Sequence, residues 1–428
     1  MFGCSDGGNR YWLNDHMADR WANPRARDRL THMDEVNQER LAERWESRQL
    51  SRRSLFKSAG IFALAGAAGP LFPTGGMAHS GPGGADIGNE VVISSIPNET
   101  VRLGQFRMDV PDLTTVDSET VLVYPDTLTH FLGALKPGVP IGDLAKLRLD
   151  NPGKGPHSVI GPVAVRDAKP GDMVEVRFLK LDPIDFGANF HNPLLPGVRT
   201  GALPEEFPAG QVIYFDLDRE NMRTEFRPGS GIHIPLAPFQ GIFGVAPPGA
   251  AEAVNSVPPG QHAGNIDLRD LTAGSTLWIP VWRDGARLYT ADTHVAQGDG
   301  EVNLTAIESA LRELRVKVIL HPGALANVPE ADRWPMAETA THWIAIATAA
   351  PEPNQATAFR EAFLRALHNV INFLHTRVGL TRDDAYALSS IAVSFRITQV
   401  VDINIGVHGM IPKDIFEEEV RQRITIAD

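Results

Sequence analysis

The chain has 428 residues, of which 43% are hydrophobic and 21% charged, and its formal net charge at pH 7 is −12. These values are typical of a globular protein that is large enough for more than one core. The acidic balance, and the lack of a basic stretch beyond residue 60, argue against a nucleic-acid partner. The only cysteine is Cys4, so the body of the protein has no disulfide, no thiolate metal site and no cysteine nucleophile.

The amino-terminal region divides into an extension and an export signal. Residues 1–50 are polar, with some helical spacing around 34–48, and we predict a disordered or weakly helical extension. Ser-Arg-Arg-Ser-Leu-Phe-Lys at 51–57 is similar to a twin-arginine signal. The apolar run 59–72 that follows is shorter than the ~20 residues of a membrane helix.

We therefore predict a signal peptide over residues 51–80 and export to the periplasm in the folded state by the twin-arginine machinery. After cleavage we expect no stable membrane association. A single amino-terminal membrane anchor is the alternative interpretation.

Residues 81–428 are predicted to form the globular body. The chain has 39 Gly and 32 Pro, which indicates many short elements joined by turns and favours β structure. Apolar residues at helical spacing predict two helices near the carboxyl end, over 356–378 and 380–395, the second capped by Thr381. We predict an α+β fold with mostly β content, a β-sandwich or barrel-like body with helices towards the carboxy-terminal end. Strands are expected within 91–96, 120–124, 155–165, 169–177 and 271–281.

The stretch 288–308 concentrates side chains that ligate metals or move protons. Residues two apart in a strand point to the same face, so Asp292 and His294 are expected to project together. The Gly298-Asp299-Gly300 turn can fold Asp299 and Glu301 back towards them. A polar hairpin on an exposed edge is the alternative, but this clustering of Asp, His and Glu favours a functional site.

This stretch also resembles a known family. The run from Asp292 to Glu301, followed by 305–308, resembles the acetamidase/formamidase family. Similar segments extend the resemblance over 91–416, with two departures: Gln240 stands where proline is usual, and Leu268 where cysteine is common. The resemblance implies hydrolysis of a small amide and a homo-oligomer. The segments that carry it are 155–177, 232–248, 264–281 and 380–416.

The same residues allow hydrolysis of a small carboxamide with the help of a divalent cation. Asp292 and His294 are the predicted metal ligands, with Asp267 third. Zinc suits an Asp/His site. Calcium is the alternative, because it needs more oxygen ligands and this acidic cluster could also supply them.

Glu301 is the predicted general base and acid, which takes a proton from water and passes it to the leaving ammonia. Glu308 is an alternative base, although it could face the other side of the strand. Asp299 is a candidate for orienting His294.

Four further residues are candidates for contacting the substrate. Gly241 and Gly244 lie between bulky apolar residues, so their amides could donate to a substrate oxygen, although a tightly packed bend is the alternative. His157 and Asn265 are polar candidates, and a loop histidine is an equal alternative for His157.

Two other classes of protein remain open. One is a metal-dependent oxygenase on a β-barrel, in which two histidines and one carboxylate face an iron, with His157 and His233 as the available histidines. The other is a periplasmic protein that binds amides or sugars without turnover.

Overall fold

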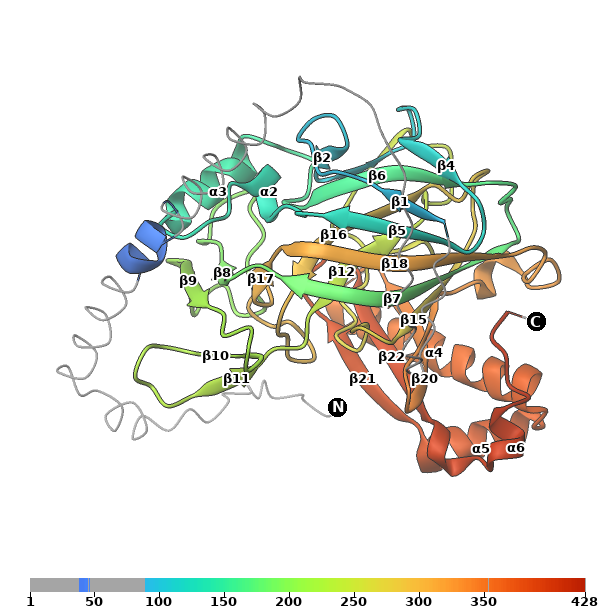
Figure 1. Ribbon diagram of the computed structural model, residues 1–428. Helices are drawn as coiled ribbons and strands as arrows, with labels where there is room; N and C mark the ends of the chain where they lie inside the picture. The colour runs from blue at the N-terminus through green and yellow to red at the C-terminus, as the bar shows by residue number, and fades with distance from the viewer. Residues whose placement is uncertain (1–37, 45, 47–88, 353, 428) are drawn as a thin grey trace, which may run out of the picture.

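The computed structural model describes residues 38–44, 46, 89–352 and 354–427. The predicted signal at 51–80 and most of the extension at 1–50 lie outside these residues. Residues 38–44 and 46 are helical, and Leu41 is buried against the body. The body has a β-rich core with helices gathered at its carboxy-terminal end (Figure 1).

The described residues form two nine-stranded sheets. In the first, β18 lies between β5 and β7 and pairs with both in antiparallel register. In spatial order its strands are β1 (Glu90–Val92), β5 (Thr120–Pro125), β18 (Leu311–His321), β7 (Met173–Pro183), β15 (Thr276–Pro280), β19 (Met336–Glu338), β20 (His342–Ala349), β22 (Ile405–Pro412) and β21 (Ser394–Gln399).

The second sheet is built around β16. That strand pairs with β12, β17 and β6, so it is surrounded by other strands. The main path runs β14 (Ala263–Asn265), β12 (Phe239–Gly244), β16 (Leu288–His294), β17 (Glu308–Ser309), β8 (Phe186–His191) and β9 (Gln211–Asp216). Off this path, β6 (Ser158–Val165) also pairs with β2 (Val101–Leu103) and β4 (Thr114–Val116). Two small pairs join β10 (Arg223–Glu225) to β11 (His233–Pro235) and β3 (Gln105–Arg107) to β13 (Ala253–Asn255).

The main core lies between these two sheets. Val174, Val176 and Phe178 of β7 are buried in one cluster with Phe239 and Phe243 of β12. The rings of Phe178 and Phe243 meet edge to face with centroids 5.7 Å apart. The prediction of a mostly β sandwich is therefore confirmed, and both sheets are open rather than closed into a barrel within the described residues.

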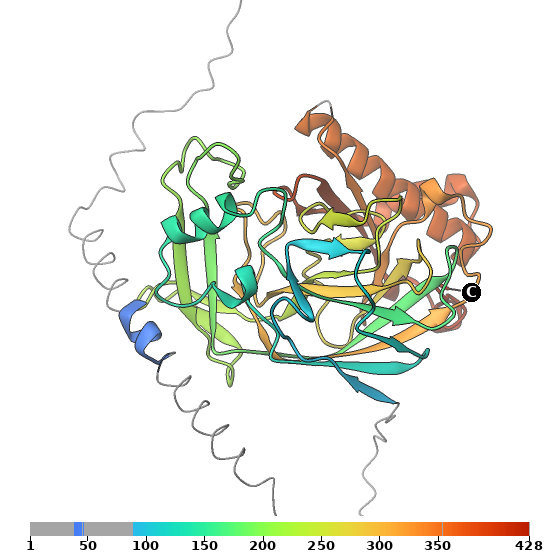
Figure 2. The same ribbon diagram turned by 90° about the horizontal axis from the view of Figure 1, so that it is seen from above.

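The carboxy-terminal helices cover one side of the first sheet (Figure 2). Helix α4 (Gln355–Phe373) packs on β20 and β22 through Ala358, Ala362 and Ala366, which recur every four residues. It continues as a π-helical turn, Leu374–Val378. Helix α5 (Arg382–Ala392) begins as predicted, because the hydroxyl of Thr381 accepts from the amide of Asp384 at 3.1 Å.

The shorter helices of the described part of the chain are α2 (His130–Gly133), α3 (Ile141–Leu149) and α6 (Glu418–Arg421), together with the 3₁₀ helices Glu330–Asp332 and Lys413–Ile415. The first two lie ahead of β6, near the end of the second sheet that carries the site. Among the residues described, no helix combines the length and the apolar character needed to span a membrane.

Candidate active site

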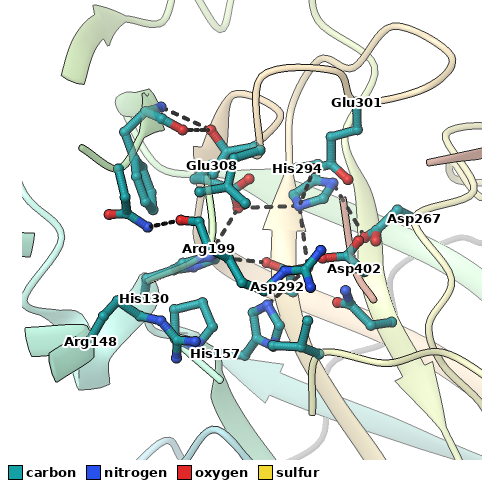
Figure 3. A pocket seen from close by; sticks show the side chains of 17 residues that line it. His130, Arg148, His157, Arg199, Asp267, Asp292, His294, Glu301, Glu308 and Asp402 are labelled. Carbon is teal, nitrogen blue, oxygen red and sulfur yellow. Dashed lines mark hydrogen bonds and ion pairs between the residues drawn. The ribbon is translucent and has the colours of Figure 1, made fainter. Parts of the chain in front are cut away.

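A buried cavity with a volume of about 40 Å³ lies at the second sheet, beside β16 and β17. Its walls come from segments far apart in the sequence (Figure 3). The ionisable and amide side chains that line it are His130, Arg148, His157, Asn192, Arg199, Asn265, Asp267, Asp292, His294, Glu301, Glu308 and Asp402.

Strand β16 supplies Asp292 and His294, which point into the same cavity as predicted. His294 Nε2 lies 3.3 Å from Asp292 Oδ2. Strand β17 runs antiparallel to β16, with Glu308 directly opposite His294, and Glu308 Oε2 lies 3.2 Å from the same nitrogen. Cross-strand partners share a face of the sheet, so Glu308 faces the cavity and not the other side.

Gly241 on β12 leaves the space in which these groups meet. A Cβ at this position would lie 2.5 Å from Asp267 Oδ1 and 2.6 Å from Asp292 Oδ2. Any larger residue would therefore displace the carboxylates. The structure gives Gly241 this steric role, and donation of its amide to the substrate stays a prediction.

Two histidines enter the cavity from the amino-terminal half. His130 Nε2, at the start of α2, lies 3.6 Å from Asp292 Oδ1 and 3.7 Å from Glu308 Oε2. His157 Nε2, just ahead of β6, lies 3.9 Å from Asp292 Oδ2. A hydrogen bond of 2.8 Å between His157 Nδ1 and Ser256 Oγ fixes the ring. His157 was expected to bind substrate, but Asp292 and His130 are its immediate neighbours.

Gln297 orients His294. Gln297 Oε1 lies 2.9 Å from His294 Nδ1, and its amide nitrogen donates to the carbonyl of Asp267 at 2.9 Å. The prediction that Asp299 does this is wrong. Asp299 points out of the cavity, where it contacts Arg269 at 3.8 Å and Arg396 at 3.9 Å.

Glu301 and Asp267 reach the cavity as predicted and meet Asp402 there. One oxygen of each of these three carboxyls lies within 4.8 Å of the others. Glu301 Oε1 also lies 4.0 Å from His294 Nε2. Asp267, Asp292 and Glu301 all have positive φ angles, of 50°, 62° and 48°, an uncommon conformation for residues other than glycine. Such backbone strain clusters at functional sites.

Burial controls the charge of the histidines. It lowers the pKa of His130 to about 4 and that of His157 to about 3, so both rings are neutral at pH 7. Burial alone would also lower the pKa of His294, but the neighbouring Glu308 and Asp292 raise it well above its ordinary value.

Burial and neighbouring charges also set the pKa values of the carboxyls. Burial opposes the ionisation of Asp292, yet the adjacent His294 holds the pKa of Asp292 well below its usual range. Burial raises the pKa of Glu308 to about 7 and that of Asp402 to about 7. Burial, reinforced by neighbouring carboxyls, raises the pKa of Asp267 and of Glu301 well above normal. The cavity therefore holds acid and base groups of differing strength.

Several groups in the cavity have metal-ligand spacing. Within the described residues, four sets of three place their ligand atoms within 4.8 Å of one another. One is the predicted Asp267, Asp292 and His294. Another, His130, His157 and Asp292, offers two neutral imidazoles and one ionised carboxylate.

The remaining candidates divide by position. Asn265 lines the cavity, and its buried Oδ1 has no hydrogen-bond partner among the described residues. Gly244 does not line the cavity, because it lies further along β12, in register with Ala263 and Tyr289. His233 is exposed on β11.

Sequence reasoning missed four ionisable residues of the cavity: His130, Arg148, Arg199 and Asp402. No motif surrounds His130. Asp402 lies within the 380–416 segment that resembles the family, which could have marked it. The two arginines stand in a helix and a loop without any motif.

Comparisons with known proteins agree with this architecture. The sequence is 24% identical over 326 residues to a formamidase of Methylophilus methylotrophus, covering 62% of this chain and 78% of that protein. It is 24% identical over 204 residues to an acetamidase of Mycolicibacterium smegmatis, covering 34% and 49%. The crystal structure of an acetamidase from Bacillus halodurans is similar, with a TM-score of 0.62 and 26% identity, covering 76% of this chain and 99% of that one.

A gamma lactamase from Delftia acidovorans is also similar, with a TM-score of 0.50 and 25% identity, covering 75% of this chain and 90% of that one. The model of the Acetamidase/Formamidase family matches residues 97–250 and 248–418, which is most of the described body. The chain belongs to the acetamidase/formamidase family, a family of amidohydrolases.

Proposed function

We propose that the protein hydrolyses a small carboxamide to a carboxylate and ammonia with the help of a divalent cation. Family membership and the likeness to an acetamidase structure support amide hydrolysis. The observation that carries the rest is one buried cavity in which two neutral imidazoles and a carboxylate meet beside the His294–Glu308 pair. At about 40 Å³, the cavity has room only for a small substrate.

The residues fit a cation. The donor set of His130, His157 and Asp292 has the composition that zinc sites use, and Asp292 Oδ1 is buried without a hydrogen bond among the described residues. Calcium would need more oxygen ligands than this set offers. When bound, such a cation polarises an amide carbonyl or lowers the pKa of a bound water. This set replaces Asp267, Asp292 and His294 as the ligands that we favour, because imidazoles bind metals in the neutral form.

Glu308 is the base that we favour for the attacking water. Its Oε2 lies between His130 Nε2 and His294 Nε2, at 3.7 Å and 3.2 Å. Glu301, whose Oε1 lies 4.0 Å from the same His294 nitrogen and whose pKa is raised well above normal, would give the leaving ammonia a proton that it already carries. The proton that Glu308 takes from the water would then restore the proton on Glu301. His294 touches both carboxyls and orders them, while Gln297 holds its ring.

One observation supports the alternative, a metal-dependent oxygenase. An oxygenase of this type needs two histidines and one carboxylate around its iron, and His130, His157 and Asp292 have that composition. The same set therefore serves either chemistry, and family membership favours hydrolysis.

The test measures three quantities on the full chain: bound metal, ammonia released from formamide and acetamide, and oxygen consumed. We expect stoichiometric metal, ammonia release and no oxygen uptake. His130→Ala and His157→Ala should lose both the metal and the hydrolysis, whereas His233→Ala, at an exposed histidine, should keep both. Oxygen uptake without ammonia would favour the oxygenase, and amide binding without turnover would favour a binding protein.

A further inference from the structure

The cavity contains two arginines that amide hydrolysis does not require. Arg148 comes from the carboxyl end of α3, and Arg199 from the loop between β8 and β9. Both line the cavity that holds the histidines and carboxyls (Figure 3). A neutral amide such as acetamide offers no group that would call for two guanidinium charges.

Within the described part of the chain, the hydrogen bonds of both arginines go to backbone carbonyls and not to carboxylates. Arg148 Nη1 donates to the carbonyl of Lys154, and Arg199 Nη2 to the carbonyl of Val401. Among the described residues, neither guanidinium lies within 4.0 Å of a carboxylate, and Arg199 Nε is buried without a hydrogen-bond partner. Carbonyl oxygens therefore satisfy part of each donor set. Asp402 offsets part of the charge of Arg199 from a distance, but neither guanidinium forms an ion pair with a carboxylate among the described residues.

The two charges are close enough to act on each other. Burial lowers the pKa of Arg148, and the charge of Arg199 lowers it further. Like charges in a partly buried site are costly unless an anion lies between them. The planar guanidinium fork matches a carboxylate in shape, with hydrogen bonds stronger than those between neutral groups.

The arginines also border the groups that would act on the amide. The charge of Arg148 contributes to lowering the pKa of His130 and His157. The charge of Arg199 acts to lower the pKa of Asp402, against the effect of burial. An anion held by the arginines would thus share one small cavity with the reacting amide. In about 40 Å³ the two groups belong to one short molecule.

We propose that Arg148 and Arg199 form a carboxylate subsite, and that the preferred substrate is the monoamide of a short dicarboxylic acid. This rests on the proposed amide hydrolysis. Arg199 would hold the carboxylate from the loop between β8 and β9.

The test compares malonamate with malonamide, which differ by a carboxylate against a neutral amide of similar shape. We expect the wild-type protein to favour malonamate in kcat/KM by roughly tenfold or more, the scale of a charge-assisted hydrogen bond. Arg148→Gln and Arg199→Gln should each bring the ratio towards one, while Arg148→Lys and Arg199→Lys should retain part of it. Arg283→Gln is the matched control, because Arg283 also donates to backbone carbonyls, Pro247 and Ala251, but lies outside the cavity.

A second measurement separates this inference from the proposed function. Binding of malonate to the metal-loaded protein, followed by calorimetry, should weaken in Arg199→Gln and not in Arg283→Gln. If ammonia is released equally from both amides by the wild-type protein, hydrolysis stands and the carboxylate subsite is overturned. If neither amide is hydrolysed but malonate binding still depends on Arg199, the subsite stands and the proposed hydrolysis fails.

The arginines could instead hold only the carboxylate product. In that case Arg199→Gln would weaken inhibition by acetate, while the wild-type ratio of malonamate to malonamide would already be one. That result would overturn the proposed substrate class. Because the decisive ratio is measured on the wild-type protein, a variant that fails to fold does not rescue the inference.

Discussion

His294 and Glu308 face each other across the β16–β17 pair, with Nε2 of the imidazole 3.2 Å from Oε2 of the carboxylate. The segment 295–307 connects the strands and brings Glu308 back to the face that His294 occupies. The register thereby puts Glu308, a carboxyl that can receive a proton, beside the strand that carries Asp292, the proposed metal ligand.

Glu308→Gln tests this relationship. The amide fills the same space but cannot take a proton, so we expect hydrolysis to fall by about 10²–10⁴-fold while the bound metal stays. Glu301→Gln should cost less, since Glu301 Oε1 lies 4.0 Å from His294 Nε2. Single-turnover rates and metal content of both variants give the comparison. A larger loss in Glu301→Gln would return the role of base to Glu301.

Gly241→Ala tests the steric role of β12. The new Cβ would meet the carboxylates of Asp267 and Asp292 at 2.5 and 2.6 Å, so one must move. We expect metal content and activity to fall, with a loss of about 1–3 kcal/mol in the free energy of unfolding, as for other overpacked sites. Urea unfolding and metal analysis measure both.

Gly298→Ala is the control for that experiment, because a Cβ there meets nothing within 4 Å. Normal metal content and activity in Gly241→Ala would contradict the crowding described for the cavity.

The sequence carried much of this architecture, but only where the signal is local. Alternation in a strand was enough to bring Asp292 and His294 together, and a cap residue was enough to begin α5 at Thr381. The side of the sheet to which Glu308 belongs depends on the register of β17 against β16, which a single strand does not reveal.

His130 shows the same limit. Its contact with Asp292 joins α2 to β16, two elements far apart in the sequence, and nothing near His130 in sequence marks it. The predicted strand over 91–96 likewise ends early, at Val92, because its pairing with β5 ends near there. Contacts between residues far apart in the sequence therefore determine the position of His130 and the end of β1, and local sequence patterns do not reveal them.

A buried histidine away from the cavity predicts sensitivity to acid. His408 on β22 is fully buried, with Nδ1 2.7 Å from Thr398 Oγ1 and Nε2 without a partner among the described residues. Burial lowers the pKa of His408 from 6.5 to about 3. Between these two pKa values the unfolded chain binds a proton at His408 and the folded protein does not. The free energy of unfolding therefore falls as the pH drops from about 6.5 towards 3.

At about pH 5 this single group should cost roughly 2 kcal/mol of folding free energy relative to neutral pH. His408→Gln should remove that part of the pH dependence, and His233→Gln, at an exposed site, should not. Urea unfolding of metal-free protein at both pH values gives the difference. An identical pH dependence in wild type and His408→Gln would count against the buried neutral ring.

We propose export by the twin-arginine route, and this proposal predicts where a signal variant will be found. Arg52→Lys with Arg53→Lys should keep the precursor in the cytoplasm. Cleavage within 51–80 would also remove the helical residues 38–44, where Leu41 is buried and Arg44 Nη1 pairs with Asp216 Oδ2 at 2.6 Å. Fractionation and the mass of the periplasmic protein test both points. Periplasmic protein in the double variant, or mature protein that still contains Leu41, would contradict the proposal.

The cavity draws side chains from positions as far apart as His130 and Asp402, so no short fragment of the chain contains the site. A cation held there would bind the folded protein and not the unfolded chain, which stabilises the fold by about 4 kcal/mol when the free ion is a thousandfold above its dissociation constant. A chelator would withdraw that contribution and expose the chain to proteases. The supply of the metal would then govern how long each molecule survives, as well as how fast it works.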